Sequence, residues 1–398
     1  MSEVMRMKLY QKKRLNLNVL CCWLVALYPV LFRYKSPISQ VTLSEFLMII
    51  FWGVTWVNNF KTRRIKICGD VIPLIIYLVF QVLIIVAKDM GDLETLDAVG
   101  TTFRLAFLYL MISTVVYQYV SIDVLQQKIH IVSIVLSLYG LIQTAFAMIG
   151  IYLSTYIPFL PIIGSNIDEE IYKKAQIGLT YRCTSFLTEP AALGTYLTLA
   201  LALALFREKD SKIHGKAFLY TVCLLVCRSS TAVIMAAFLW GIKYITVNKM
   251  NKKIAMNFVL GTGVTLPLVI AFLIKTGILE FFIERTFSDG ITGNSRLYAL
   301  DMMLEVFDSP GKALLGNGLV TLSEYLPGFA RTLYCLGIVG LICFVWIYLR
   351  VYQKGTRFSN ILLVTFIILN IGTEAMLGNF SIIYMPFLII HHIYRMDQ

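Results

Sequence analysis

Long apolar segments recur along the whole chain, and this pattern constrains the fold more than any other feature of the sequence. A helix that crosses the hydrocarbon core of a bilayer needs about 20 mostly apolar residues. Hydrophobic residues make up 58% of the 398 positions and the mean hydropathy is +0.75, which excludes an ordinary soluble domain. We therefore predict an all-α polytopic membrane protein in which residues 1–398 form a single transmembrane domain.

The apolar segments predict about twelve transmembrane helices. The seventh segment is short and the last two are barely separated, so ten or eleven helices remain alternatives. The expected bounds are Leu17–Phe32, Val41–Val57, Val71–Ala87, Thr101–Val120, Ile129–Ile151, Phe186–Phe206, Ala217–Cys227, Thr231–Val247, Ile254–Ile274, Thr332–Tyr348, Ile361–Glu374 and Phe380–Tyr394.

The placement of lysine and arginine predicts the orientation of these helices. With a cytoplasmic N-terminus, 22 of the 35 basic residues fall on the cytoplasmic side and 12 on the outer side, while Arg104 lies within a helix. An excess of basic residues in short loops marks the cytoplasmic side of a membrane protein. Both termini are therefore predicted to be cytoplasmic. The net charge of +12 fits this orientation and anionic lipid headgroups, and it does not indicate nucleic-acid binding.

Two long loops, both predicted on the outer side, interrupt the series of short connections. They cover residues 152–185 and 275–331. The second contains an amphipathic stretch, Ser295–Phe307, which predicts a helix on the membrane or over the bundle. Long loops without a span of their own are usually functional or disordered, so we expect the chemistry on the outer face. Three glycines mark predicted turns near the end of this loop: Gly311, Gly316 and Gly318.

One segment carries an arginine and a carboxylate from a polar loop into the beginning of an apolar helix. Charge beside hydrocarbon is costly unless it is paired, hydrated or needed for chemistry. Glu189 precedes Pro190, which suits a first helical turn, so Glu189 is expected near the N-cap. Its carboxylate either satisfies the helix N-terminus, or it orients Arg182 or accepts a proton from an attacking hydroxyl.

Five arginines on the predicted outer face are candidate binding residues. The planar guanidinium of arginine binds phosphate in a bidentate manner and keeps its charge, so these residues suit a lipid-linked diphosphate. Alternatively, some of these side chains extend to the interface or pair with nearby acids, and Glu374 is a candidate partner. The residues are Arg182, Arg228, Arg285, Arg296 and Arg331.

A sixth arginine, Arg104, is a functional candidate because of its depth in the fourth predicted helix. An isolated arginine inside a bilayer costs about 2.5 kcal/mol or more, although Arg104 lies near the helix start and can extend outward. All four histidines map to the cytoplasmic side, and no nucleotide-binding glycine motif or zinc-ligand spacing is present. We therefore expect chemistry that uses no metal, cofactor or bound nucleotide.

Four motifs between Arg182 and Leu341 occur in an order that resembles one membrane-enzyme family. They are Arg182-Cys-Thr-Ser-Phe-Leu-Thr-Glu189-Pro190, Arg228-Ser-Ser-Thr-Ala, Arg296-Leu followed by Leu315-Gly316-Asn317-Gly318, and Leu336-Gly337-Ile-Val-Gly340-Leu. In this order and spacing the chain resembles the bacterial O-antigen and capsular polysaccharide polymerase/ligase superfamily. Ligases of that family carry a histidine in the outer loop, and Leu322–Tyr334 contains none, which favours a polymerase.

The resemblance implies a C-type membrane glycosyltransferase fold in the bacterial cytoplasmic membrane. The implied reaction joins lipid-diphosphate-linked oligosaccharide repeat units on the outer face, with a flippase and a chain-length regulator as possible protein partners. It implies that Arg182, Arg285 and Arg296 lie near the diphosphates and that Glu189 orients or deprotonates the acceptor. Residues implied to bind substrate are Arg228, Arg331, Arg104, Tyr181 and Tyr298. A lipid-linked oligosaccharide flippase or transporter, a ligase and a structural membrane protein are the alternatives.

Overall fold

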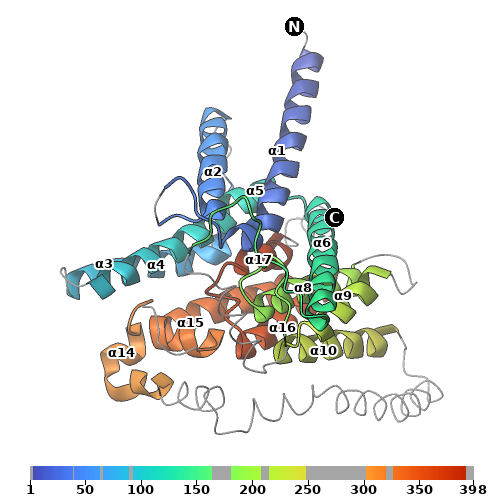
Figure 1. The fold of residues 1–398 in the computed structure, drawn as a ribbon. Coiled ribbons are helices and arrows are strands. Elements are labelled where there is room, and N and C mark those ends of the chain that lie inside the picture. Colours follow the sequence, from blue (N-terminus) through green and yellow to red (C-terminus); the bar gives the residue numbers. More distant parts are fainter. Residues whose placement is uncertain are drawn as a thin grey trace.

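The computed structural model of this protein is almost entirely helical in the parts of the chain that it describes (Figure 1). These parts are residues 3–38, 40–62, 66–88, 93–163, 181–207, 215–247, 302–319 and 326–390. Within them, the extended pairing is limited to two isolated antiparallel bridges, Tyr34–Ile162 and Lys35–Thr42. The predicted all-α class is therefore confirmed for the described residues.

Helices occupy eleven of the twelve predicted segments. The remaining segment, Ile254–Ile274, is the ninth in chain order and lies outside the described residues. In chain order the elements are α1 (Glu3–Leu31), α2 (Leu43–Thr62), η1 (Gly69–Val71), α3 (Ile72–Lys88), α4 (Leu93–Met111), η2 (Ile112–Val116), α5 (Tyr117–Tyr119), α6 (Ile122–Met148), α8 (Pro190–Phe206), α9 (Gly215–Val226), α10 (Ser230–Val247), η3 (Glu305–Asp308), α14 (Pro310–Leu315), α15 (Gly328–Lys354), α16 (Arg357–Gly372) and α17 (Ser381–Ile389).

Four helical stretches in the described parts are long and apolar enough to cross a membrane. They are Gly69–Val86, Leu96–Tyr119, Ile122–Met148 and Gly328–Lys354. Several shorter apolar helices accompany them, among them α8 and α16. These lengths and compositions are those of a helical membrane protein. The count of twelve spans remains a prediction.

Helix α8 forms the centre of the bundle, where it packs against α6, α9, α10 and α16 (Figure 1). Its sequence is apolar on every side, which is typical of a helix surrounded by protein. All residues from Ala192 to Leu205 are buried. Close packing depends on Gly194, because a Cβ atom there would lie 2.7 Å from the Cβ of Ala232 in α10. The core therefore holds the beginning of α8 in a fixed place.

The end of the second long loop is locked against a break in α15. Gly337 interrupts that helix with φ 64°, and a Cβ atom on it would lie 2.4 Å from the carbonyl oxygen of Leu314. The backbone N–H groups of Asn317 and Gly318 donate to the carbonyls of Tyr334 and Cys335, at 2.9 Å each. Two glycine motifs that are separate in sequence therefore form one interlocked structure.

The glycine predictions for this loop are confirmed in two cases and wrong in one. Gly316 and Gly318 adopt positive φ values of 74° and 91°, as expected in turns. Gly311 instead lies inside α14, because Ser309 caps that helix and Pro310 begins it. Of the predicted helix Ser295–Phe307, only residues 302–307 lie in the described part, and they form a helical turn that leads into η3.

Candidate functional site

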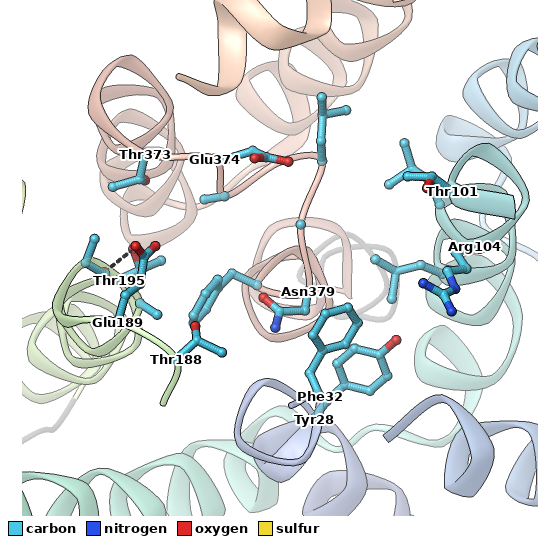
Figure 2. Close-up of a pocket in the computed structure, with 18 of the residues that line it drawn as sticks. Tyr28, Phe32, Thr101, Arg104, Thr188, Glu189, Thr195, Thr373, Glu374 and Asn379 are labelled. Carbon is cyan, nitrogen blue, oxygen red and sulfur yellow. Dashed lines mark hydrogen bonds between the residues drawn. The ribbon is translucent and has the colours of Figure 1, made fainter. Parts of the chain in front are cut away.

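Five segments that are distant in sequence enclose a cavity of about 350 Å³. They are the end of α1, the beginning of α2, the middle of α4, residues 188–195 at the beginning of α8, and residues 373–380 between α16 and α17. Figure 2 shows Glu189 and Arg104 on opposite sides of this space, with Glu374 on a third side. Two predicted site residues, Arg104 and Glu189, are therefore brought to one cavity.

Arg104 is paired with a carboxylate that the sequence prediction did not include. Its Nε atom lies 3.7 Å from the Glu45 carboxylate, and 44% of the Arg104 side chain is exposed. Glu45 also forms a capping box at the start of α2: the Thr42 N–H donates to its carboxylate at 2.7 Å, and its own N–H donates to the Thr42 hydroxyl at 3.2 Å. The cap fixes Glu45, and Glu45 in turn fixes Arg104 beside the cavity.

Glu189 lies at the N-cap of α8, directly before Pro190, as predicted. Its backbone is extended, and its side chain makes no capping hydrogen bond with the helix. The carboxylate therefore does not cap the helix by a hydrogen bond, and the prediction that its charge favours the helix N-terminus stays a prediction. The side chain instead forms part of the cavity wall, together with Thr188 and Ala191 (Figure 2).

Glu374 is the third carboxylate of the cavity, and Arg331 at the beginning of α15 forms an ion pair with it. The suggestion that Glu374 pairs with one of the candidate arginines is thus confirmed, and the outer-face position of this pair stays a prediction. Burial raises the pKa of the Glu374 carboxyl, Arg331 lowers it, and the negative charge of Glu189 raises it further; the net pKa is above the ordinary glutamate value. Glu189 and Glu374 both line the cavity, so the two carboxylates belong to one site.

The loop that carries Glu374 is held firmly by its neighbours. The Gly328 N–H donates to the Thr373 carbonyl at 3.0 Å. The Met376 N–H donates to the Asn370 side chain at 2.7 Å, and the Tyr109 hydroxyl donates to the Met376 carbonyl at 2.8 Å. Helices α4, α15 and α16 therefore all fix this loop. Glu374 is presented to the cavity by a preorganised backbone.

Arg182 and Arg228 lie together in a second region, outside the residues that form the cavity wall. Both guanidinium groups interact electrostatically with the thiol of Cys183. A hydrogen bond with the Cys223 thiol is the main cause that lowers the pKa of Cys183, and the charge of Arg182 acts in the same direction. Arg228 adopts φ 51° in the tight turn between α9 and α10. Both predicted residues are therefore near enough to this buried thiol to interact with it electrostatically.

Two buried polar side chains hold the segment that leads from Arg182 to Glu189. Arg33 donates from one guanidinium nitrogen to the Thr155 carbonyl at 2.5 Å and to the Leu187 carbonyl at 3.1 Å. Gln143 of α6 accepts a hydrogen bond from the Ser185 N–H at 2.9 Å, and Ser185 has φ 54°. These contacts connect the first long loop, the end of α1 and α6 to the entrance of α8.

The remaining predicted site residues contribute less to this geometry. The ring of Tyr181 packs against Tyr152, with ring centroids 5.7 Å apart. Tyr181 is not among the described residues that line the cavity. Arg285, Arg296 and Tyr298 lie outside the described residues.

Sequence reasoning missed several residues of the site, for identifiable reasons. The Thr42-x-x-Glu45 capping-box signature was visible in the sequence and could have drawn attention to Glu45. Arg33 and Gln143 act on backbone carbonyls and amides of distant segments, and no local pattern reveals such contacts.

The chain matches no protein-family model and no curated protein.

Proposed function

We propose that this protein is a membrane glycosyltransferase that joins lipid-diphosphate-linked oligosaccharide units on the outer face of a bacterial cytoplasmic membrane. The observation that supports it most is the convergence of Arg104, Glu45, Glu189 and Glu374 on one cavity. Four of the five segments of the cavity wall are helix ends or loops that the charge pattern places on the outer side, and the fifth is the middle of α4. Arg182 begins the short segment that leads to Glu189 in the cavity wall. Arg228 lies in the turn between α9 and α10, and both of these helices pack against α8.

The proposed reaction needs only a base and a place for a departing diphosphate. The oxygen of an acceptor hydroxyl forms a bond to the anomeric carbon of the donor sugar, and the bond from that carbon to the diphosphate oxygen breaks. The electron pair leaves with the lipid diphosphate, and a carboxylate takes the hydroxyl proton. Glu189 is our choice for this carboxylate, and the arginines stabilise the charge on the leaving group.

The experiment is a conversion assay with protein purified into lipid vesicles. With native lipid-diphosphate repeat units and no added nucleotide, we expect a ladder of longer products. Arg182→Ala and Arg285→Ala should each reduce the rate by about 10²–10³-fold, as removal of one charge-stabilising group commonly does. The exposed carboxylate Asp123, which pairs with Arg207 away from the cavity, supplies the control variant Asp123→Asn. No ladder, together with unchanged chain length in cells that carry the two arginine variants at normal abundance, would contradict the proposal.

A second candidate, a transporter of lipid-linked oligosaccharides, is favoured by one specific observation. Glu374 is a partly buried carboxyl in the cavity, and its raised pKa suits a group that takes up and releases a proton. A transporter would move intact repeat units across the vesicle membrane without changing their length. The same vesicles therefore distinguish the two functions, because the products are analysed for both location and length.

A further inference from the structure

The charge of the cavity is opposite to what a diphosphate requires. Three carboxylates, Glu45, Glu189 and Glu374, contribute to its wall, against the single guanidinium of Arg104. Arg331 adds a second guanidinium through its ion pair with Glu374. The group as a whole therefore has a formal charge of −1 when all five side chains are ionised. A diphosphate placed here would be repelled by the carboxylates.

We propose that this cavity binds the sugar end of the acceptor, an uncharged and hydroxyl-rich ligand, while the lipid diphosphate binds elsewhere. This inference rests on the proposed function and assigns one part of the substrate to one site. Ionised carboxylates only accept hydrogen bonds, and sugar hydroxyls are good donors. Two of the carboxylates are already neutralised in part by arginine, which suits a neutral ligand better than a free cation.

The other walls of the cavity have the composition of a small-molecule site. Tyr28, Phe32 and Phe380 supply aromatic surface, and Asn379 and Thr188 supply polar groups that both donate and accept (Figure 2). Sites for organic ligands combine such apolar surface with a few placed polar groups, and their volumes begin at about 300 Å³. A cavity of about 350 Å³ is at the small end of this range, so it encloses one end of a long substrate rather than a whole repeat unit.

The cavity is preorganised on the side where recognition is needed. The loop with Glu374 is fixed by hydrogen bonds from three helices, as described above, and a Cβ atom on Gly328 would lie 2.4 Å from the Asn370 side chain that helps to hold it. Glu45 is fixed by its capping box. Fixed acceptors do not lose rotamer freedom when a ligand binds, which favours selective binding of a polyhydroxyl compound.

The arrangement also separates the two parts of the substrate in a chemically useful way. Arg182 and Arg228 lie around Cys183, and six residues farther along the same loop Glu189 reaches the cavity. A diphosphate near the arginines and a sugar in the cavity would therefore meet near Glu189.

Binding without turnover tests this assignment. Two probes are titrated against the full chain in lipid nanodiscs: the oligosaccharide released by mild acid from the cell's own lipid-linked fraction, and farnesyl diphosphate. Glu189→Gln and Glu374→Gln should weaken oligosaccharide binding at least tenfold and leave farnesyl diphosphate binding unchanged or tighter. Ala191→Leu, which narrows the cavity without touching an ion pair, should also weaken only the oligosaccharide. Asp123→Asn, at an ion pair away from the cavity, should change neither.

Three results would overturn the assignment of the sugar to this cavity. Loss of farnesyl diphosphate binding in the glutamine variants, or oligosaccharide binding that none of the three cavity variants weakens, would overturn the assignment. Failure of the unmodified protein to bind the oligosaccharide would do the same. If the oligosaccharide binds as expected but vesicles form no ladder, the sugar site stands and the proposed polymerase function falls.

Discussion

At the scale of single residues, Arg228 shows a conflict between backbone and side chain. Its φ of 51° lies in the left-handed region, where a residue with a Cβ atom costs about 1–2 kcal/mol and glycine costs little. Strained backbone of this kind is often found at functional sites, and the Arg228 guanidinium interacts electrostatically with Cys183, as Arg182 does. This makes Arg228 a stronger functional candidate than its place in a short turn suggested.

A pair of substitutions separates the two contributions. Arg228→Gly and Arg228→Ala should both lower the rate of glycan elongation, by about 10²-fold, because both remove the guanidinium group. The glycine variant should be more stable than the alanine variant by about 1 kcal/mol, because only glycine relieves the backbone strain. Thermal aggregation midpoints of the detergent-solubilised proteins measure the second effect. Equal stability of the two variants, or full activity in either, would contradict this account.

At the scale of elements, the interlock between the α14 end and the broken helix α15 depends on two close approaches. Gly337→Ala should destabilise the protein, because alanine at φ 64° and a Cβ atom 2.4 Å from the Leu314 carbonyl oxygen each cost about 1–3 kcal/mol. Gly241→Ala in α10 is the matched control. Nothing lies within 4 Å of its added Cβ atom, so a gain of helix propensity of up to about 1 kcal/mol is expected there. A Gly337→Ala protein with an unchanged aggregation midpoint would rule out the interlock.

The elements also show where sequence reasoning succeeds and where it stops. Apolar length predicted the position of α8, and Pro190 predicted where it begins, because both are local properties of the chain. The kink at Gly337 was not predicted. Nothing local in Leu336-Gly337 distinguishes a packed helical glycine from one at positive φ, and the cause is the approach of Leu314 and Gly316 from another segment. The partner of Arg104 was missed in the same way, since Glu45 lies two helices earlier in the chain.

At the scale of the whole molecule, the ion pairs join helix ends and loops that the charge pattern assigns to the same side of the membrane. The ion pairs Asp123–Arg207 and Asp70–Lys354 join residues assigned to the cytoplasmic side. Arg331–Glu374 and Arg104–Glu45 join residues assigned to the outer side, and four of the five segments of the cavity wall are predicted outer ends or loops.

The same grouping gives a test of the orientation itself. A reporter fused after Gly355 should lie on the cytoplasmic side, one fused after Gly378 on the outer side, and one fused at the full-length C-terminus on the cytoplasmic side. The reason is that α16, and then α17 with the residues after it, are predicted to cross the membrane in opposite directions. A fluorescent protein that matures only in the cytoplasm and a phosphatase that is active only outside it measure the two sides independently. If the Gly355 and Gly378 fusions report the same side, α16 does not cross the membrane. The Glu374 loop and the cavity that it completes would then not open on the outer face, where the proposed joining of units takes place, and the proposed function would lose its support.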